Sequence, residues 1–289
     1  MNSVPCLFYK SVFSSFFFEE PLAACRNLQG LFGCVASESY ENWRRLSVRV
    51  NNDSVTREKY SNIQGQLVGV EKIDRRRLCY IGVEIGANEQ EYSPDPAVPQ
   101  KLANATRRNP VVLILNSRII SAETEKCVKA IPVVFELHLN VELTAEVLSI
   151  VQSFAQKKTL NYIYFEAQLE EQTSQLILEL LKQKQLHTMS IKYCFKTIKE
   201  IFASWREHAE EMVANEVYCM DNPEDLLQIV SDEFGFEECT AEDENYLRRY
   251  YPFAAQGLKI QSVLKCGEGR AIYCLFGKRF KHATLFLFT

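Results

Sequence analysis

The chain has 289 residues, of which 47% are hydrophobic, so it can bury a large core in one or two domains. Its net charge of −4 gives no indication of binding to nucleic acid or to an anionic membrane. No apolar run reaches the ~18 residues that a membrane-spanning helix needs. Lys10 and Glu19-Glu20-Pro21 interrupt the apolar start, which therefore differs from a signal peptide. We expect a soluble protein of the cytoplasm or nucleus.

Residues 4–46 predict a small module of three short helices. Four apolar side chains define one face of the first helix: Phe8, Val12, Phe13 and Phe16. Pro21 suits the first turn of a second helix, which would present Leu22, Cys25 and Leu28 on one side. A third helix would carry Phe32, Val35, Tyr40 and Trp43 and end near Leu46. The module is too small to be stable alone, so we expect it to pack on other parts of the chain or on a partner.

The next part of the chain changes to strand-like patterns. Alternating or β-branched runs predict four strands: residues 45–50, 66–73, 76–85 and 110–115.

From residue 131 onward, strands and helices alternate at a constant spacing. The predicted strands cover residues 133–139, 161–167, 188–193 and 216–220. Their centres, Phe135, Ile163, Ile191 and Cys219, are separated by 28 residues each time (163−135, 191−163 and 219−191). Amphipathic segments between the strands predict helices with the following apolar faces: Leu143, Val147, Ile150, Val151 and Phe154; Leu176, Ile177, Leu180 and Leu181; Ile198, Ile201, Phe202 and Trp205. Asn222-Pro223 would begin a fourth helix.

A strand and a helix repeated at a fixed period indicate an α/β solenoid resembling leucine-rich repeats, in which stacked units share one core. An ordinary open βαβ sheet is the alternative. The tail predicts a hairpin of residues 258–265 and 270–276, followed by a last strand, so that an antiparallel cap would close the sheet. The predicted fold class is therefore α/β, with a helical module, an irregular solenoid and this cap.

No local pattern of catalytic or metal-binding residues is present. The ten cysteines form no C-x-x-C pair, and the four histidines have no partner at metal-binding spacing. No G-x-S-x-G or phosphate-binding glycine motif occurs either. The acidic residues between 232 and 244 lack calcium-binding spacing and predict a solvated loop, or a rim that favours a basic partner. We expect no catalytic residue, metal, cofactor or small-molecule substrate.

The first 46 residues resemble an F-box. Val4-Pro5 stands where the family has Leu-Pro, and Trp43-Arg44-Arg45-Leu46 resembles its closing Trp-Arg-x-Leu. Leu28 and Phe32 fall near the middle of the motif. The whole chain is most similar to the large nematode expansion of F-box-like proteins, which join such a module to a variable α/β or repeat region. The resemblance implies a module at residues 1–46 and a substrate-binding region at 47–289.

The resemblance also implies a function. The module would dock on the Skp-type adaptor of a cullin–RING ubiquitin ligase, and the repeat region would hold a protein substrate. Candidate anchors on the adaptor are Val4, Pro5, Phe8, Val12, Phe16 and Leu22. The chain itself would be no enzyme.

Two other interpretations stay open. The chain could be a leucine-rich-repeat-like scaffold without a ligase role, and its N-terminal aromatic residues would then pack inside the chain. It could also be an enzyme with an unrecognised α/β fold, which would require a deep pocket with convergent polar groups.

Overall fold

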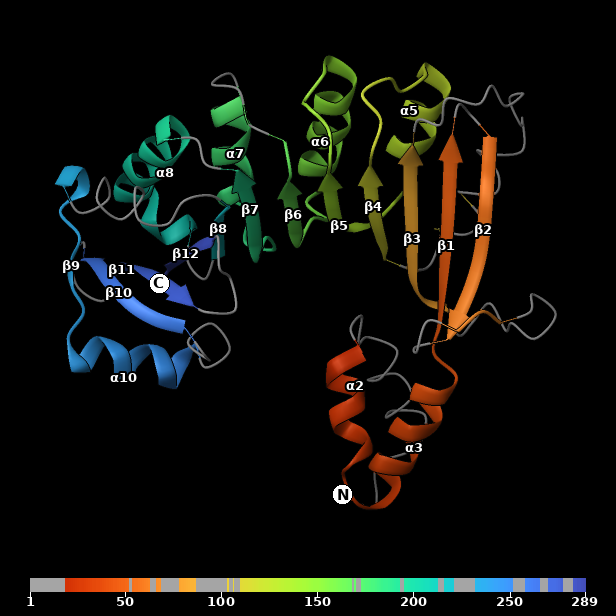
Figure 1. Cartoon of the computed structure of the whole chain (residues 1–289), viewed down its shortest axis with the longest axis horizontal. Helices are drawn as coiled ribbons and strands as arrows, with labels where there is room; N and C mark the ends of the chain where they lie inside the picture. Colours follow the sequence, from red (N-terminus) through yellow and green to blue (C-terminus); the bar gives the residue numbers. More distant parts are fainter. Residues whose placement is uncertain are drawn as a thin grey trace. The chain divides into compact units, whose positions relative to one another are not determined.

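A computed structural model describes most of the chain (Figure 1). The described residues are 19–51, 54–62, 66–68, 78–86, 103, 106, 110–167, 169, 173–192, 195–212, 216–220, 232–251, 258–265, 270–277 and 283–289. The chain divides into two compact units, Met1–Glu136 and Leu137–Thr289. Residue 46, the predicted boundary of the helical module, lies within the first unit. Both units combine α-helices with an open β-sheet, as the sequence predicts at the level of the α/β class.

The first unit consists of a helical hairpin followed by a sheet. Its elements are α2 (Glu19–Arg26), α3 (Gly30–Glu41), β1 (Arg44–Asn51), β2 (Ser54–Asn62), β3 (Leu78–Gly86), β4 (Val111–Leu115) and α5 (Ala122–Lys129). The strand order is β2-β1-β3-β4. β1 pairs antiparallel with β2 and parallel with β3, and β3 pairs parallel with β4.

The α2–α3 hairpin confirms two of the three predicted N-terminal helices. Its small core consists of Val35, Ala36, Tyr40 and Trp43, with Ala23, Cys25 and Phe32 packed around it. A β-carbon at Gly33 would lie 1.8 Å from the carbonyl oxygen of Leu28, so only glycine allows the turn to approach α3 this closely. The first predicted helix, with Phe8, Val12, Phe13 and Phe16, lies outside the described residues.

Two details of this unit differ from the prediction. Leu28 was expected on the apolar face of the second helix, but α2 ends at Arg26 and the Leu28 side chain is 53% exposed. Strand β2 was missed, because its sequence SVTREKYSN is mostly polar and shows no apolar alternation. β2 is the edge strand of its sheet and pairs with β1. An edge strand can carry polar and charged residues where it meets water.

The second unit contains the regular strand–helix alternation. β5 (Val134–Leu139) crosses the division between the units. It is followed by α6 (Ala145–Lys157), β6 (Tyr162–Phe165), α7 (Ser174–Leu181), β7 (Thr188–Lys192), α8 (Phe195–His208), a 3₁₀ turn (Ala209–Glu211) and β8 (Glu216–Met220). The remaining elements are β9 (Glu237–Glu238), α10 (Ala241–Tyr250), β10 (Leu258–Lys265), β11 (Ala271–Gly277) and β12 (Ala283–Phe288). All four strands predicted between residues 133 and 220 are confirmed. The helix predicted after Asn222-Pro223 lies outside the described residues.

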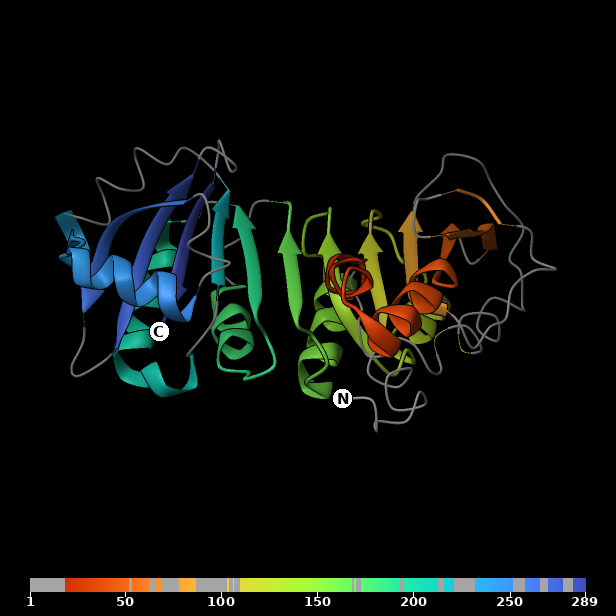
Figure 2. The ribbon, with the colours of Figure 1, turned by 90° about the horizontal axis from the view of Figure 1, so that it is seen from below.

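Helices α6, α7 and α8 all lie on the same face of strands β6–β8 (Figures 1 and 2). The apolar positions predicted for α6 and α8 are buried, from Val147 and Phe154 to Phe202 and Trp205, except Leu143, which precedes α6 and is only partly buried. Alternate strand residues meet these helices, and Ile163, Met189 and Val217 are buried as a result.

The register of β6 and β7 differs from the constant 28-residue step. Ile163 lies opposite Met189, and Ile191 lies opposite Phe165, so this pair is offset by two residues from the prediction. Between β7 and β8 the step of 28 is kept, with Ile191 opposite Cys219. A slip of two residues leaves every side chain on its original face, so burial does not prevent it.

The last three strands form an antiparallel extension of the second unit, as predicted. β10 and β11 make the expected hairpin, and β12 inserts between β11 and β8, giving the order β6-β7-β8-β12-β11-β10-β9. One face of these strands packs on α8, where Phe202 contacts Phe286 and Trp205 contacts Phe288.

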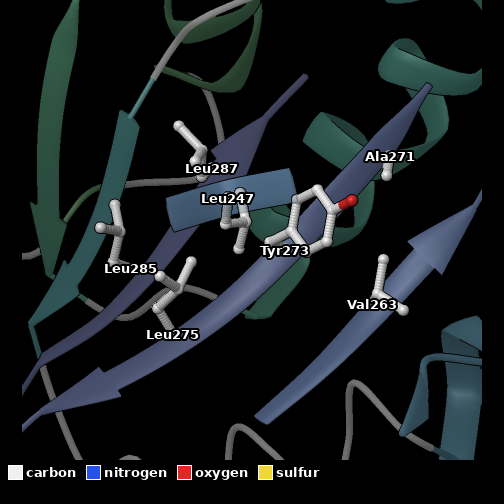
Figure 3. Close-up of a cluster of buried hydrophobic side chains, with 7 residues drawn as sticks. All are labelled: Leu247, Val263, Ala271, Tyr273, Leu275, Leu285 and Leu287. Atoms are coloured by element: carbon white, nitrogen blue, oxygen red, sulfur yellow. The ribbon is translucent and has the colours of Figure 1, made fainter. Parts of the chain in front are cut away.

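Helix α10 covers the other face of the C-terminal strands (Figure 3). Leu247 packs there against six strand residues: Val263, Ala271, Tyr273, Leu275, Leu285 and Leu287. Part of the predicted acidic loop 232–244 is therefore the first turn of this helix. Thr240 and Asp243 form a reciprocal capping box, in which each side chain accepts a hydrogen bond from the other residue's backbone N–H.

Candidate interaction surface

Two rows of side chains cross the face of β6–β8 that lies opposite α6–α8. In the first row, Tyr162 of β6 lies beside Thr188 of β7, which lies beside Glu216 of β8. In the second row the order is Tyr164, Ser190 and Tyr218. We call these six residues the tyrosine face. Within the second unit, no helix that the structure describes lies over it.

The tyrosine face combines tall aromatic side chains with small hydroxyl residues. Tyr162, Tyr164 and Tyr218 are partly exposed, whereas Thr188 and Ser190 are only 8% and 5% exposed. Strands two positions apart are separated by roughly 10 Å, so the tyrosine rings of β6 and β8 rise on both sides of β7 and cover its short side chains. The surface offers aromatic rings above a floor of hydroxyl groups.

Two histidines extend this surface at its β6 side. The imidazole of His138 stacks on the ring of Tyr164, with centroids 4.4 Å apart and planes inclined by 10°. His187 is exposed and its ring centroid lies 6.5 Å from that of Tyr162. The backbone fixes these positions, because Glu166 N–H donates to Leu139 and His187 N–H donates to Asn161. Aromatic side chains have few rotatable bonds, so they lose little entropy when a partner binds.

Glu216 is the only carboxylate in the tyrosine face. The phenol of Tyr218 donates a hydrogen bond of 3.1 Å to its Oε2. Burial raises the pKa of the Glu216 carboxyl above its ordinary value, while Tyr218, His187 and Thr188 act in the opposite direction. Burial and the adjacent Glu216 also raise the pKa of the Tyr218 phenol. The carboxylate is thus partly desolvated, and the hydroxyl groups of Tyr218 and Thr188 and the imidazole of His187 lie around it.

Helix α10 limits the tyrosine face on its β12 side. Leu285 and Leu287 of β12 lie beside Tyr218 and Glu216, on the same face of the sheet. They are buried under Leu247 of α10, and Tyr218 packs against this cluster. The exposed surface therefore ends at β8.

Of the sequence-predicted adaptor anchors, Val4, Pro5, Phe8, Val12 and Phe16 lie outside the described residues, and Leu22 lies within α2. Sequence reasoning missed the tyrosine face, although the alternation of Tyr162 and Tyr164 with buried Ile163 and Phe165 was visible. Which side chains lie beside these tyrosines depends on the β6–β7 register, which the sequence did not reveal.

The α2–α3 hairpin presents a second exposed surface, in the first unit. Leu28 and Leu31, at the turn between the helices, are 53% and 43% exposed. A shallow depression of about 480 Å³ beside them is lined by Arg26, Leu28, Gly30, Gly33, Cys34, Ser37, Glu38 and Glu41. Arg26 also lies over the ring of Tyr40, 4.1 Å from its centroid. Exposed leucines and an arginine beside a depression are suited to contact with another protein.

Comparisons with known proteins return no match. No family model matches the chain, and no curated protein or solved structure does. Among the described residues, no group of three or more His, Cys, Asp or Glu side chains could hold a metal ion. The described helices include none with the length and apolarity needed to cross a membrane. Six cysteines whose side chains the structure describes are not joined in disulfides: Cys25, Cys34, Cys127, Cys219, Cys239 and Cys274.

Proposed function

We propose that the chain is a protein-interaction subunit that recognises a substrate for a cullin–RING ubiquitin ligase of the SCF type. The observation that carries the proposal is the tyrosine face, because a rigid patch of partly exposed tyrosines is typical of the centre of protein interfaces. The ligase chemistry belongs to the partners in this proposal, and the chain acts in the cytoplasm or nucleus.

The proposal treats residues 137–220 as an irregular solenoid resembling leucine-rich repeats. Support comes from helices α6, α7 and α8, which all lie on one face of parallel strands β6–β8. A doubly wound open sheet places its helices on both faces instead. In a solenoid the face without helices is the surface that binds a partner, and here the tyrosine face occupies it.

The proposal assigns adaptor binding to the N-terminal module. The α2–α3 hairpin supports this, because Leu28 and Leu31 are exposed on a helical hairpin whose own core is already filled by Val35, Tyr40 and Trp43. These leucines would join the anchors expected from the resemblance, among them Pro5 and Phe8.

A binding measurement with a purified Skp-type adaptor tests this proposal. We expect the full-length chain to bind with micromolar affinity or better. The double variant Leu28→Asp/Leu31→Asp should bind at least tenfold more weakly, because charged side chains would replace apolar contacts. The matched control is Leu67→Asp, since Leu67 is also exposed (68%) and belongs to the same unit, where it pairs with Ser61 of β2.

Two outcomes would contradict the ligase role. One is the absence of adaptor binding by a chain that circular dichroism shows to be folded. The other is equal binding of the double variant and the wild type, which would remove the hairpin from the interface. Absence of binding would favour the alternative, a leucine-rich-repeat-like binding protein without a ligase role.

A further inference from the structure

The electrostatics of the tyrosine face are unbalanced. Glu216 carries the only negative charge in it, and the structure pairs this carboxylate with the hydroxyl of Tyr218. The imidazole of His187 acts on this carboxylate, but the nearest lysine or arginine of strands β6–β8 on the same face is Lys192, which follows Thr188 by four residues on β7. That separation is roughly 13 Å along the strand, beyond the reach of an ion pair.

Two aromatic residues share this part of the tyrosine face with the carboxylate. Tyr218 follows Glu216 by two residues on β8, and Tyr162 lies across Thr188 in the same row. The faces of tyrosine rings attract cations, and the attraction strengthens where water is partly excluded. Burial around Glu216 supplies such a partly desolvated setting.

We propose that the Glu216 end of the tyrosine face recognises an arginine or lysine side chain of a bound polypeptide. The carboxylate of Glu216 would pair with the cation, and the rings of Tyr162 and Tyr218 would contact its stem and charged head. Charge complementarity selects this occupant, because an acidic or purely apolar side chain would desolvate the carboxylate further without supplying a compensating positive charge. The exposed imidazole of His187 lies beside the same end and can donate or accept further hydrogen bonds.

This inference rests on the proposed interaction role of the tyrosine face and is independent of adaptor docking. The adaptor measurement changes Leu28 and Leu31 in the first unit, whereas the experiment below changes residues of the second unit. Either proposal can therefore fail while the other holds.

The experiment titrates small cationic probes into the full-length chain and monitors the NMR signals of its tyrosine rings. The probes are N-acetyl-arginine methylamide, its lysine counterpart and the neutral isostere N-acetyl-citrulline methylamide. We expect the arginine or lysine probe to bind with millimolar affinity, and the citrulline probe to bind at least tenfold more weakly. The ratio of the arginine to the lysine affinity then shows which cation the site prefers.

Three variants locate the site. Glu216→Gln should weaken binding of the cationic probe about tenfold, while it keeps an acceptor for the Tyr218 hydroxyl. Tyr162→Leu should weaken it severalfold, because it keeps apolar volume but removes the ring. Glu237→Gln is the matched control, since Glu237 is an exposed carboxylate on β9, and it should bind like the wild type.

Two results would overturn the inference. The first is equal binding of the cationic probe to the wild type and to Glu216→Gln. The second concerns the occupant: the peptide acetyl-Gly-Ser-Arg-Ser-Gly-amide should bind at least as tightly as the single-residue probe. Weaker binding of the peptide would mean that the site accepts a free small cation and not a polypeptide.

Discussion

The ammonium group of Lys265 lies 2.9 Å from one carboxylate oxygen of Asp243 and 3.1 Å from the other. This ion pair connects strand β10 to the first turn of helix α10, where Asp243 also accepts hydrogen bonds from the backbone N–H and hydroxyl of Thr240. Burial alone would raise the pKa of Asp243, but the hydrogen bonds from Thr240 and Lys265 outweigh it and lower the pKa. One side chain thus caps a helix and attaches it to the sheet.

We expect Asp243→Ala to lower the free energy of unfolding by about 1–2 kcal/mol, because it removes a helix cap and an ion pair. The folded-state pKa of Asp243 is depressed, so its contribution is present above the unfolded pKa of about 3.9. The contribution is lost as the pH falls through the lower folded-state value. Chemical denaturation of both proteins across pH 2–7 measures this difference. Glu242→Gln is the control, and a pH-independent difference would contradict the assignment.

Gly33→Ala is expected to destabilise the α2–α3 hairpin, although alanine normally favours a helix over glycine by about 1 kcal/mol. The reason is the backbone carbonyl of Leu28, which a β-carbon at this position would meet at 1.8 Å. Hydrogen exchange of the amides of α3 would measure the loss of protection. Ser39→Ala, in the same helix, should leave protection unchanged or increase it. Greater protection in the Gly33 variant would show that the turn does not approach α3 this closely.

Phe202→Ala should lower the free energy of unfolding by about 3–5 kcal/mol, as is typical for a buried phenylalanine. Phe202 is buried and contacts the rings of Phe234, Phe236 and Phe286, so its removal leaves a cavity between α8 and β12. Phe202→Leu should cost less, because it fills part of the space. Urea denaturation followed by tryptophan fluorescence can rank the two variants. A loss below 1 kcal/mol for alanine would contradict this packing.

Glu216→Gln should raise the free energy of unfolding at neutral pH. The pKa of Glu216 is raised in the folded state, so the ionised carboxylate opposes folding above that pKa. Protonation relieves this cost, and the difference between the variant and the wild type should shrink as the pH falls toward the unfolded pKa of about 4.3. Denaturation midpoints at pH 4 and pH 7.5 would test the sign. Destabilisation at both pH values would contradict it.

The sequence predicted the second unit well because its apolar residues follow clear periods. The helix faces around Phe154 and Trp205 and the strand containing Ile163 are all buried as expected. The β6–β7 register was wrong by two residues, since strand periodicity fixes which face a side chain occupies and not how far a strand slides. The residues of β7 that lie beside Tyr162 and Tyr164 depend on this register, so the composition of the tyrosine face could not be predicted.

The sequence did not predict α5, β9, β2 or α10, and in the last two charged residues hide the pattern. β2 is a polar edge strand, and α10 begins inside an acidic run. For α10 a usable signal was present, because Thr240 and Asp243 have the spacing of a capping box just before Leu247. For β2 we find no comparable signal in the sequence.

The position of β12 has a consequence for the order of folding. β8 gains its antiparallel neighbour only when β12 arrives, and β9, α10, β10 and β11 all precede β12 along the chain. During synthesis the parallel strands can pair as they emerge, but one side of β8 keeps unpaired amide and carbonyl groups until the last strand is made. Such non-local pairing slows folding, and until it forms the unpaired edge of β8 can pair with other chains and aggregate. The nascent second unit is therefore a candidate client for chaperones, which would shield β8 until its neighbour exists.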